Sequence, residues 1–276
     1  MPIFRGNVGN LLQHWVFCEL LEVYGSHADR LDFVDAYSMA PLADERPKLD
    51  ATAHLFDCVR ERLPGEQTAY ERAWYKLAPC SGQYPNSAAF LAVTWPGRYS
   101  MLLCESEPTT LQQLKAWERQ AESVHNCVGV EIAAGDWRTR FRHGLSVSGG
   151  VILLSFDPYM FDRHGPGRNP GNMDPADLDL LGATVESIEA GVLVQLSTYS
   201  ANNDNPQSAV TEVVSSRLAR VGLQLLAAVR ADGNMMSLVL GRNIETAVSI
   251  CALPGRFDSW LARAKAECQR ATSGAV

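Results

Sequence analysis

The feature that most constrains this chain is an alternation of short apolar segments, typical of buried strands, with segments of helical spacing. The segments predicted as strands are residues 31–35, 99–104, 127–132, 150–154, 191–197, 223–230 and 236–240. Most are followed by a helical pattern, which indicates a mostly parallel sheet with helices between its strands. The last two are joined by a turn containing glycine and are expected to form a hairpin. We therefore predict an α/β fold with a sheet of about seven strands.

Helices are predicted where apolar residues recur at intervals of three and four. The predicted helices cover residues 9–24, 87–94, 108–125, 175–190 and 209–221. Residues 44–79 are polar, helical in pattern and broken at Leu63-Pro64-Gly65, so they look like an inserted helical pair. We expect one domain over residues 1–276, with a helical insertion at 44–95 after the first strand.

Acidic residues follow the first four predicted strands of the alternating pattern. They are Asp35, Glu105, Asp136 and Asp157. The carboxyl ends of parallel strands meet at one edge of the sheet, which is where open α/β sheets bind ligands. A single acid in such a place is often only the cap of the next helix. Four in succession favour a binding site.

Charge and cysteine pattern restrict the function classes. The net charge is −7, whereas proteins that bind a nucleic-acid backbone usually carry a basic surface. The densest basic cluster lies at residues 138–143, and we interpret it as a solvated helix face, with a nucleic-acid-binding patch as the alternative. The seven cysteines form no C-x-x-C pair, so no zinc or redox motif is indicated. With no signal-peptide pattern and no apolar run near the roughly 20 residues of a membrane span, we expect a cytoplasmic protein without membrane or metal partners.

Several short motifs resemble those of the RlmJ-type ribosomal RNA adenine-N6 methyltransferases. Gly6-Asn7, followed by Leu12 and His14, is similar to the family's first G-N-x-x-x-x-L-K-H segment. Tyr84-Pro85-Asn86-Ser87 is similar to its Y-P-G-S segment. The strand ending at Glu105, the Gly135-Asp136 step, Asp157-Pro158-Tyr159 and a hairpin at 233–243 follow in the family's order.

This resemblance covers nearly the whole chain and implies a Rossmann-like class I fold that uses S-adenosylmethionine (SAM). It implies ribosomal RNA, or another nucleic acid, as the partner. Glu105 would accept hydrogen bonds from the ribose hydroxyls of SAM, and Asp136 from its adenine amine. Asp35, Ser38 and His14 fall in the family's other cofactor-binding segments.

The resemblance also assigns the catalytic motif to Asp157, Pro158 and Tyr159. Asp157 would accept a hydrogen bond from the target amine, and Tyr159 would stack on a target base held outside any helix. The family has D-P-P-Y here, so one proline is missing. Without a gap, Ser155 aligns with the catalytic acid, whereas a one-residue insertion aligns Asp157 and Tyr159. The sequence leaves both registers open.

A second departure concerns the cofactor loop, residues 35–41, which has no glycine where the family has two. Glycine lets a backbone pass close to a cofactor, so Met39 and Pro41 could fill the room that SAM needs. Gln13 stands where the family has a lysine.

These departures leave three functions open. The first is a SAM-dependent methyltransferase similar to the adenine-N6 enzymes. The second is a catalytically inactive methyltransferase-fold subunit that binds or assembles with a protein partner. The third is a methyltransferase of a small molecule or protein, which the acidic charge would suit better.

Overall fold

The computed structural model describes residues 3–5, 8–47, 65–78, 83–121, 126–148, 150–162, 171–199, 207–231, 234–244 and 247–273. Gly6-Asn7 of the first motif, most of the predicted break at 63–65 and the hairpin turn at 232–233 lie outside these residues.

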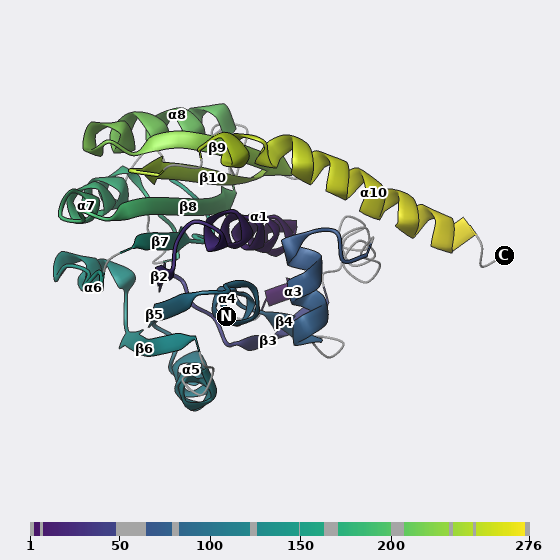
Figure 1. Ribbon diagram of the computed structural model, residues 1–276, viewed down its shortest axis with the longest axis horizontal. Coiled ribbons are helices and arrows are strands. Elements are labelled where there is room, and N and C mark those ends of the chain that lie inside the picture. Colours follow the sequence, from purple (N-terminus) through teal and green to yellow (C-terminus); the bar gives the residue numbers. More distant parts are fainter. Residues whose placement is uncertain are drawn as a thin grey trace.

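A seven-stranded sheet forms the centre of the molecule, in the order β6-β5-β2-β7-β8-β10-β9 (Figure 1). Its strands are β2 (Arg30–Asp35), β5 (Arg98–Glu105), β6 (Cys127–Ala134), β7 (Val151–Phe156), β8 (Gly191–Tyr199), β9 (Gln224–Ala231) and β10 (Met235–Arg242). All neighbours are parallel except β10, which is antiparallel to both β8 and β9. The chain has the Rossmann-like class I methyltransferase fold, and the predicted sheet and hairpin are confirmed.

Helices cover both faces of this sheet (Figure 1). One face packs against α1 (Val8–Gly25), α4 (Ser87–Thr94) and α5 (Pro108–Ala121). The other packs against α6 (Trp137–Arg142), α7 (Pro175–Glu186) and α8 (Gln207–Leu218), which is followed by a short 3-10 turn at Ala219–Val221. The buried apolar side chains of the strands therefore enter two separate hydrophobic cores.

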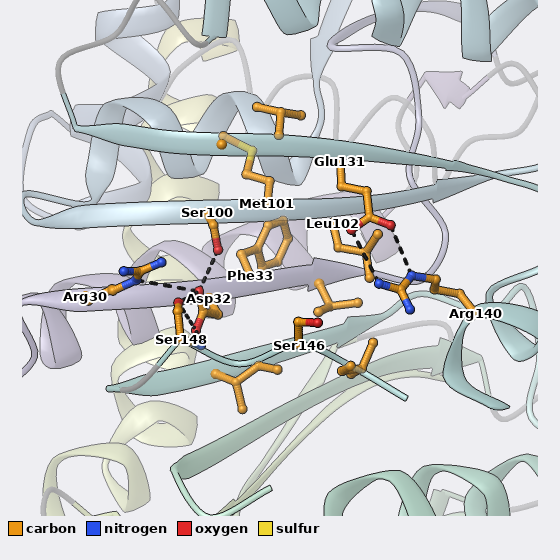
Figure 2. A pocket seen from close by; sticks show the side chains of 15 residues that line it. Arg30, Asp32, Phe33, Ser100, Met101, Leu102, Glu131, Arg140, Ser146 and Ser148 are labelled. Carbon is orange, nitrogen blue, oxygen red and sulfur yellow. Dashed lines mark hydrogen bonds and ion pairs between the residues drawn. The ribbon is translucent and has the colours of Figure 1, made fainter. Parts of the chain in front are cut away.

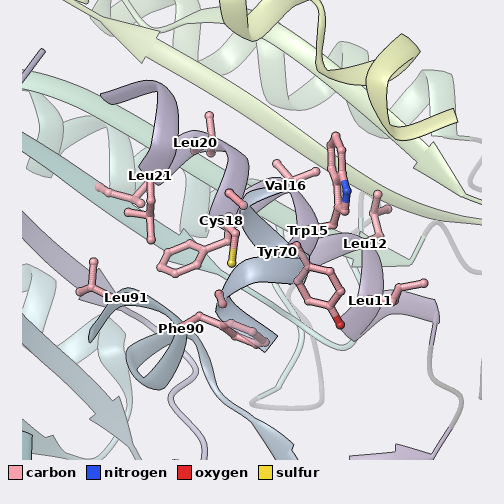
Figure 3. Close-up of a cluster of buried hydrophobic side chains, with 14 of the residues drawn as sticks. Leu11, Leu12, Trp15, Val16, Cys18, Leu20, Leu21, Tyr70, Phe90 and Leu91 are labelled. Carbon is pink, nitrogen blue, oxygen red and sulfur yellow. The ribbon is translucent and has the colours of Figure 1, made fainter. Parts of the chain in front are cut away.

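The core under α1 is rich in aromatic side chains (Figure 3). Trp15 of α1 is fully buried, and Phe33 of β2 points to the same core. The next residue, Val34, points to the opposite core, as the two-residue period of a strand requires. By the same alternation, Asp35 at the end of β2 is on the α1 side of the sheet, with Phe33.

The insertion after β2 contains strands as well as helices. β3 (Leu42–Pro47) and β4 (Gln83–Pro85) form a small sheet with β1 (Ile3–Arg5), which the helical pattern did not predict. α3 (Ala69–Leu77) begins with a capping box formed by Thr68 and Glu71. α4 begins at the predicted residue, where the Asn86 side chain accepts a hydrogen bond from the Ala89 N–H at 2.8 Å.

Two helices at the C-terminal end were missed by the sequence analysis. They are α9 (Ala247–Cys251) and α10 (Leu253–Ser273). Phe257, Trp260, Ala264 and Cys268 are buried on one side of α10, at helical spacing. The Phe257 and Trp260 rings lie 5.2 and 6.1 Å from the ring of Trp15, so α10 packs against α1 before it extends away from the body (Figure 1).

Candidate functional site

The structure places all four acids at the carboxyl edge of the parallel strands. Asp35 and Glu105 are the last residues of β2 and β5. Asp157 directly follows β7, and Asp136 lies two residues beyond β6. Because β2 lies between β5 and β7, Asp35 is flanked on both sides by another acid.

Asp35 and Asp157 are an acid pair without a positive partner among the described residues. Burial raises the pKa of Asp35 to about 7, and the negative charge of Glu105 adds to the shift. Asp157 keeps part of its surface exposed, but the burial of its carboxyl group, together with the charge of Asp35, raises its pKa to about 8. From the described residues, Asp35 accepts one hydrogen bond, from the Tyr37 N–H at 3.2 Å. Such a pair favours a cationic ligand, which would stabilise the ionised forms.

Ser155 and Asp157 occupy different positions in the fold. Ser155 lies within β7 and is paired with Asp35 on one side and Gln195 on the other. Its hydroxyl is buried and has no hydrogen-bond partner among the described residues. Asp157 is the first residue beyond the strand, where side chains are no longer confined by neighbouring strands. This geometry favours Asp157 over Ser155 as the group that meets a substrate.

The cofactor loop adopts a conformation that does not require glycine. Among the described residues, no position between 35 and 41 has a positive φ angle. The Ala36 N–H donates to the Ser155 carbonyl at 3.0 Å, and the Ser38 N–H donates to the Cys104 carbonyl at 2.9 Å. These bonds hold the loop across the ends of β7 and β5. The Ser38 hydroxyl is buried and has no partner within the described part of the chain.

The side chain of Met39 packs against the core under α1. Its carbonyl accepts a hydrogen bond from the Asn86 side chain at 2.6 Å, and the Pro41 carbonyl accepts one from the Asn86 N–H at 3.1 Å. The start of α4 therefore fixes this half of the loop. The expectation that Met39 and Pro41 fill the room that SAM needs stays a prediction.

Glu105 caps the turn between β5 and α5. One of its carboxylate oxygens, Oε1, accepts hydrogen bonds from the N–H groups of Ser106 and Glu107 at 2.6 and 2.7 Å. Burial raises its pKa above the ordinary value, although these two bonds act in the opposite direction. The other oxygen, Oε2, makes no hydrogen bond with a described residue.

Asp136 differs from the other three acids because it has a strong cationic partner. It caps α6 through the Arg138 N–H at 2.9 Å, and it forms an ion pair with the Arg138 guanidinium at 3.1 Å. Arg138 also binds both carboxylate oxygens of Asp177, at 2.6 and 2.7 Å, and the Asn172 carbonyl. The interpretation of residues 138–143 as a solvated helix face is therefore wrong for Arg138, which is held inward, and holds for the exposed Arg142 and His143.

His14 lies inside the protein, between α1 and α4. Its ring nitrogens are 3.3 Å from the Tyr84 hydroxyl and 3.2 Å from the Ser87 hydroxyl, and its ring lies 4.9 Å from that of Phe90. Burial lowers its pKa to about 3, so the ring is neutral at physiological pH. These contacts are with the insertion, and none joins His14 to the strand-end acids.

A polar network near the acids was missed by the sequence analysis. Gln195 is fully buried and donates from Nε2 to the Gln13 carbonyl of α1 at 2.8 Å and to the Ser237 hydroxyl at 3.2 Å. The Ser197 and Ser237 hydroxyls lie 2.9 Å apart. Gln13 is itself buried, so the residue at this position cannot meet a phosphate at the surface. The sequence could have indicated this network, because polar residues at 195 and 197 interrupt the apolar pattern of β8.

The segment after Asp157 presents an exposed aromatic ring. Pro158 is buried, whereas Tyr159 is 65% exposed. The Tyr159 ring lies 6.4 Å from that of Tyr199, at an angle of 42°. Tyr199 ends β8, the strand next to β7, and sequence reasoning did not single it out.

A cavity of about 320 Å³ lies elsewhere, on the sheet face that packs against α6 (Figure 2). Buried Asp32 accepts hydrogen bonds there from Ser100 Oγ at 2.6 Å and from the Ser148 N–H at 2.8 Å. At the other end of the cavity, Glu131 pairs with Arg140 at 3.1 Å. All of these charged groups have partners and none is at the strand-end edge, so the cavity is separate from the acid pair.

Two further searches covered the described residues. None of the described helices is both long enough and apolar enough to span a membrane. Within the same part of the chain, no group of three or more His, Cys, Asp or Glu side chains is arranged to hold a metal ion.

Comparison with known proteins shows similarity at the level of structure. No family model and no curated protein matches the sequence. Protein LPL1258 from Legionella pneumophila str. Philadelphia 1, of family DUF519, is 15% identical, with a TM-score of 0.60 over 94% of each chain. Fibrillarin from Aeropyrum pernix, solved with natively bound S-adenosyl-L-methionine, is 14% identical with a TM-score of 0.35, over 56% of this chain and 60% of that chain. The likeness to LPL1258 shows that the fold extends over nearly the whole chain.

Proposed function

We propose that the protein is a SAM-dependent methyltransferase that acts on an aromatic amine, with the exocyclic amine of adenine in ribosomal RNA as the first substrate to test. The observation that carries this proposal is the buried acid pair, Asp35 and Asp157, at the ligand-binding edge of a class I methyltransferase sheet. SAM, when bound, supplies the methyl group. It also carries a sulfonium and an ammonium, which suit an acid-lined site.

The residues at the edge of the sheet fit this cofactor. The buried hydroxyl of Ser38 lacks a partner among the described residues and can bond to a polar ligand. Asp35 and Glu105 have carboxylate oxygens left for the ammonium and the ribose hydroxyls. Asp136 can accept a hydrogen bond from the adenine amine, although it shares its charge with Arg138. His14 stays a predicted cofactor contact, as a neutral ring.

Asp157 and Tyr159 are the proposed catalytic residues. An aromatic amine is a weak nucleophile because its lone pair is delocalised into the ring. A carboxylate that accepts a hydrogen bond from the amine favours the pyramidal, nucleophilic geometry, and the backbone at Pro158 can hold the second hydrogen. The exposed Tyr159 ring can support the target ring, so that the amine is held in line with the methyl group.

A methyl-transfer assay with paired variants tests this proposal. The substrate is ribosomal RNA transcribed in vitro, which carries no modification, and the donor is isotope-labelled SAM. Asp157→Ala should lower the rate at least about 100-fold, the lower end for loss of a catalytic acid–base group, and should leave SAM affinity within about threefold. Ser155→Ala is the matched control and should keep most of the activity.

The reverse pattern, with activity lost in Ser155→Ala and kept in Asp157→Ala, would assign the catalytic position to Ser155. Transfer to a small aromatic amine but not to RNA would support methylation of an aromatic amine and exclude ribosomal RNA as the substrate. No transfer to either substrate class would contradict the proposal.

The ion pair between Asp136 and Arg138 favours a second candidate function, that of a non-catalytic assembly subunit. The Asp136 carboxylate is held by Arg138, which reduces what it can offer a cofactor. A methyltransferase fold can persist after its chemistry is lost, because fold and function are separable. This candidate predicts no SAM binding at millimolar concentration, together with a stable complex with a protein partner.

A further inference from the structure

Among the described residues, Tyr159 has the most exposed of the large hydrophobic side chains, and hydrogen bonds hold its backbone in place. Tyr159 is 65% exposed, and its N–H donates to the Gly171 carbonyl at 2.8 Å. The next residue, Met160, forms an isolated parallel bridge with Tyr199. An exposed ring on fixed backbone loses little conformational freedom when it binds a ligand, as is typical of recognition residues.

The two residues that follow anchor this segment in the core. Phe161 is fully buried and pairs with Met173, which is also fully buried. The Met173 N–H donates to the Met160 carbonyl at 3.0 Å, and the Asp162 N–H donates to the Met173 carbonyl at 2.7 Å. Backbone hydrogen bonds therefore hold the segment 159–162, and the fold sets the position of the backbone that carries the Tyr159 ring.

Tyr199 brings a second ring to the same place. It lies at the end of β8, beside the segment that follows β7, with its ring centre 6.4 Å from that of Tyr159. Burial raises its pKa to about 12, and the negative charge of Asp157 adds to the shift. The hydroxyl also makes a hydrogen bond with the Gly9 backbone at the start of α1.

We propose that Tyr199 is a specificity-determining residue whose ring, together with that of Tyr159, forms a platform for a flat aromatic amine beside Asp157. This inference rests on the proposed function, because it assumes that Asp157 meets the amine. Because the two rings are tilted by 42°, a planar heterocycle that stacks on the exposed Tyr159 ring would meet the half-buried Tyr199 ring at its edge, which adds contact area beyond one tyrosine. A purine outside a duplex has the size and the flat faces that this platform requires.

The test measures quenching of 2-aminopurine, a fluorescent aromatic amine that loses emission when it stacks. The probes are 2-aminopurine riboside, a single-stranded RNA with one 2-aminopurine, and the same RNA in a duplex. Each is titrated with the full-length protein at constant salt and saturating S-adenosylhomocysteine. The wild type should bind the single strand more tightly than the duplex.

Three variants separate the ring from the hydroxyl. Tyr199→Leu removes the ring and should weaken single-strand binding about tenfold or more, the size of one base–aromatic stacking contact. Tyr199→Phe keeps the ring but loses the bond to Gly9 and should stay within about threefold. Tyr75→Leu, at a tyrosine of α3 that is 45% exposed and away from the site, should have no effect. SAM affinity should be unchanged in all three variants. If Tyr199 had only a structural role, its replacement would disturb the site and weaken SAM binding as well.

Each other outcome has a defined meaning. If the riboside binds as well as the single strand, the platform stands and the substrate is a small aromatic amine. If Tyr199→Leu binds like the wild type, or Tyr199→Phe loses as much as Tyr199→Leu, the platform is refuted. A wild-type protein that binds SAM but quenches none of the probes also refutes it, whereas failure to bind SAM overturns the proposed function itself.

Discussion

Asp32 and Asp35 lie three residues apart on β2 and are equally buried, at 4% and 3% exposed, but their surroundings are opposite. Asp32 faces the α6 side, where Ser100 and Ser148 donate hydrogen bonds to it and Arg30 lies 3.8 Å away. Asp35 faces α1, where it accepts one backbone hydrogen bond from a described residue and has two acids nearby. A satisfied carboxylate of this kind stabilises the fold, whereas an unsatisfied one is typical of a site that awaits a ligand.

The largest effect expected from this comparison is on stability, at Asp32. Asp32→Ala should lower the free energy of unfolding by about 2–4 kcal/mol, because it removes the buried carboxylate that accepts hydrogen bonds from Ser100 and Ser148. Urea denaturation measures this change. Glu131→Ala is the control, since its side chain is 59% exposed and its ion pair with Arg140 should contribute less than about 1 kcal/mol. Equal losses of stability in the two variants would show that Asp32 contributes no more to the fold than an exposed ion pair does.

Asp35→Asn should act in the opposite direction and make the protein more stable. The folded-state pKa of Asp35 is raised to about 7, above the unfolded value near 3.9, so wild-type stability falls as pH rises between these values. Asparagine cannot ionise and avoids this loss, while its oxygen can still accept from the Tyr37 N–H.

We expect Asp35→Asn to raise the free energy of unfolding by roughly 1–3 kcal/mol at pH 8 and to change it little at pH 4. Thermal or urea unfolding at the two pH values checks this. A loss of stability at pH 8 would show that Asp35 is part of the structural framework, like Asp32.

A smaller effect is expected on the pH dependence of SAM binding. The raised pKa values of Asp35 and Asp157, about 7 and about 8, mean that one or both carboxyl groups hold a proton at neutral pH. A bound cation next to Asp35 lowers the pKa of that carboxyl, so binding should release protons, and affinity should rise about tenfold between pH 6 and pH 8.5. Calorimetry in two buffers of different ionisation enthalpy counts the protons. Affinity that does not change with pH would place the cofactor away from the pair.

The smallest effect is expected at Asp136. Because its carboxylate is already held by Arg138, Asp136→Ala should weaken SAM binding by less than about fivefold. Loss of the cap of α6 should cost about 0.5–2 kcal/mol of stability. Calorimetry and thermal unfolding measure the two quantities. A loss of affinity as large as that of Asp35→Asn would show instead that Asp136 contacts the adenine directly.

The sheet and its acidic edge could be predicted from the sequence because both depend on local pattern. The alternation of strand and helix segments predicts a mostly parallel sheet, and an acid that directly follows a parallel strand has to lie at its carboxyl edge. α10 was missed although Phe257, Trp260, Ala264 and Cys268 have helical spacing, because the pattern was not followed beyond the hairpin.

Other features depend on contacts between residues far apart in the sequence and could not be predicted. Arg138 is held inward by Asp177, which lies 39 positions away, and no local pattern predicts that ion pair. Gln195 reaches the Gln13 carbonyl across 182 positions. The register at Ser155 was open for the same reason, since only pairing with Asp35 and Gln195 shows that Ser155 lies inside the strand.

The most direct test of the account is calorimetric titration of the wild-type protein and of Asp35→Asn with SAM at pH 8. The account predicts micromolar binding by the wild type, and binding at least about tenfold weaker by a variant that is more stable to unfolding. No wild-type binding at millimolar SAM, or equal binding by the two proteins, would contradict the claim that the acids at the strand ends form a cofactor site.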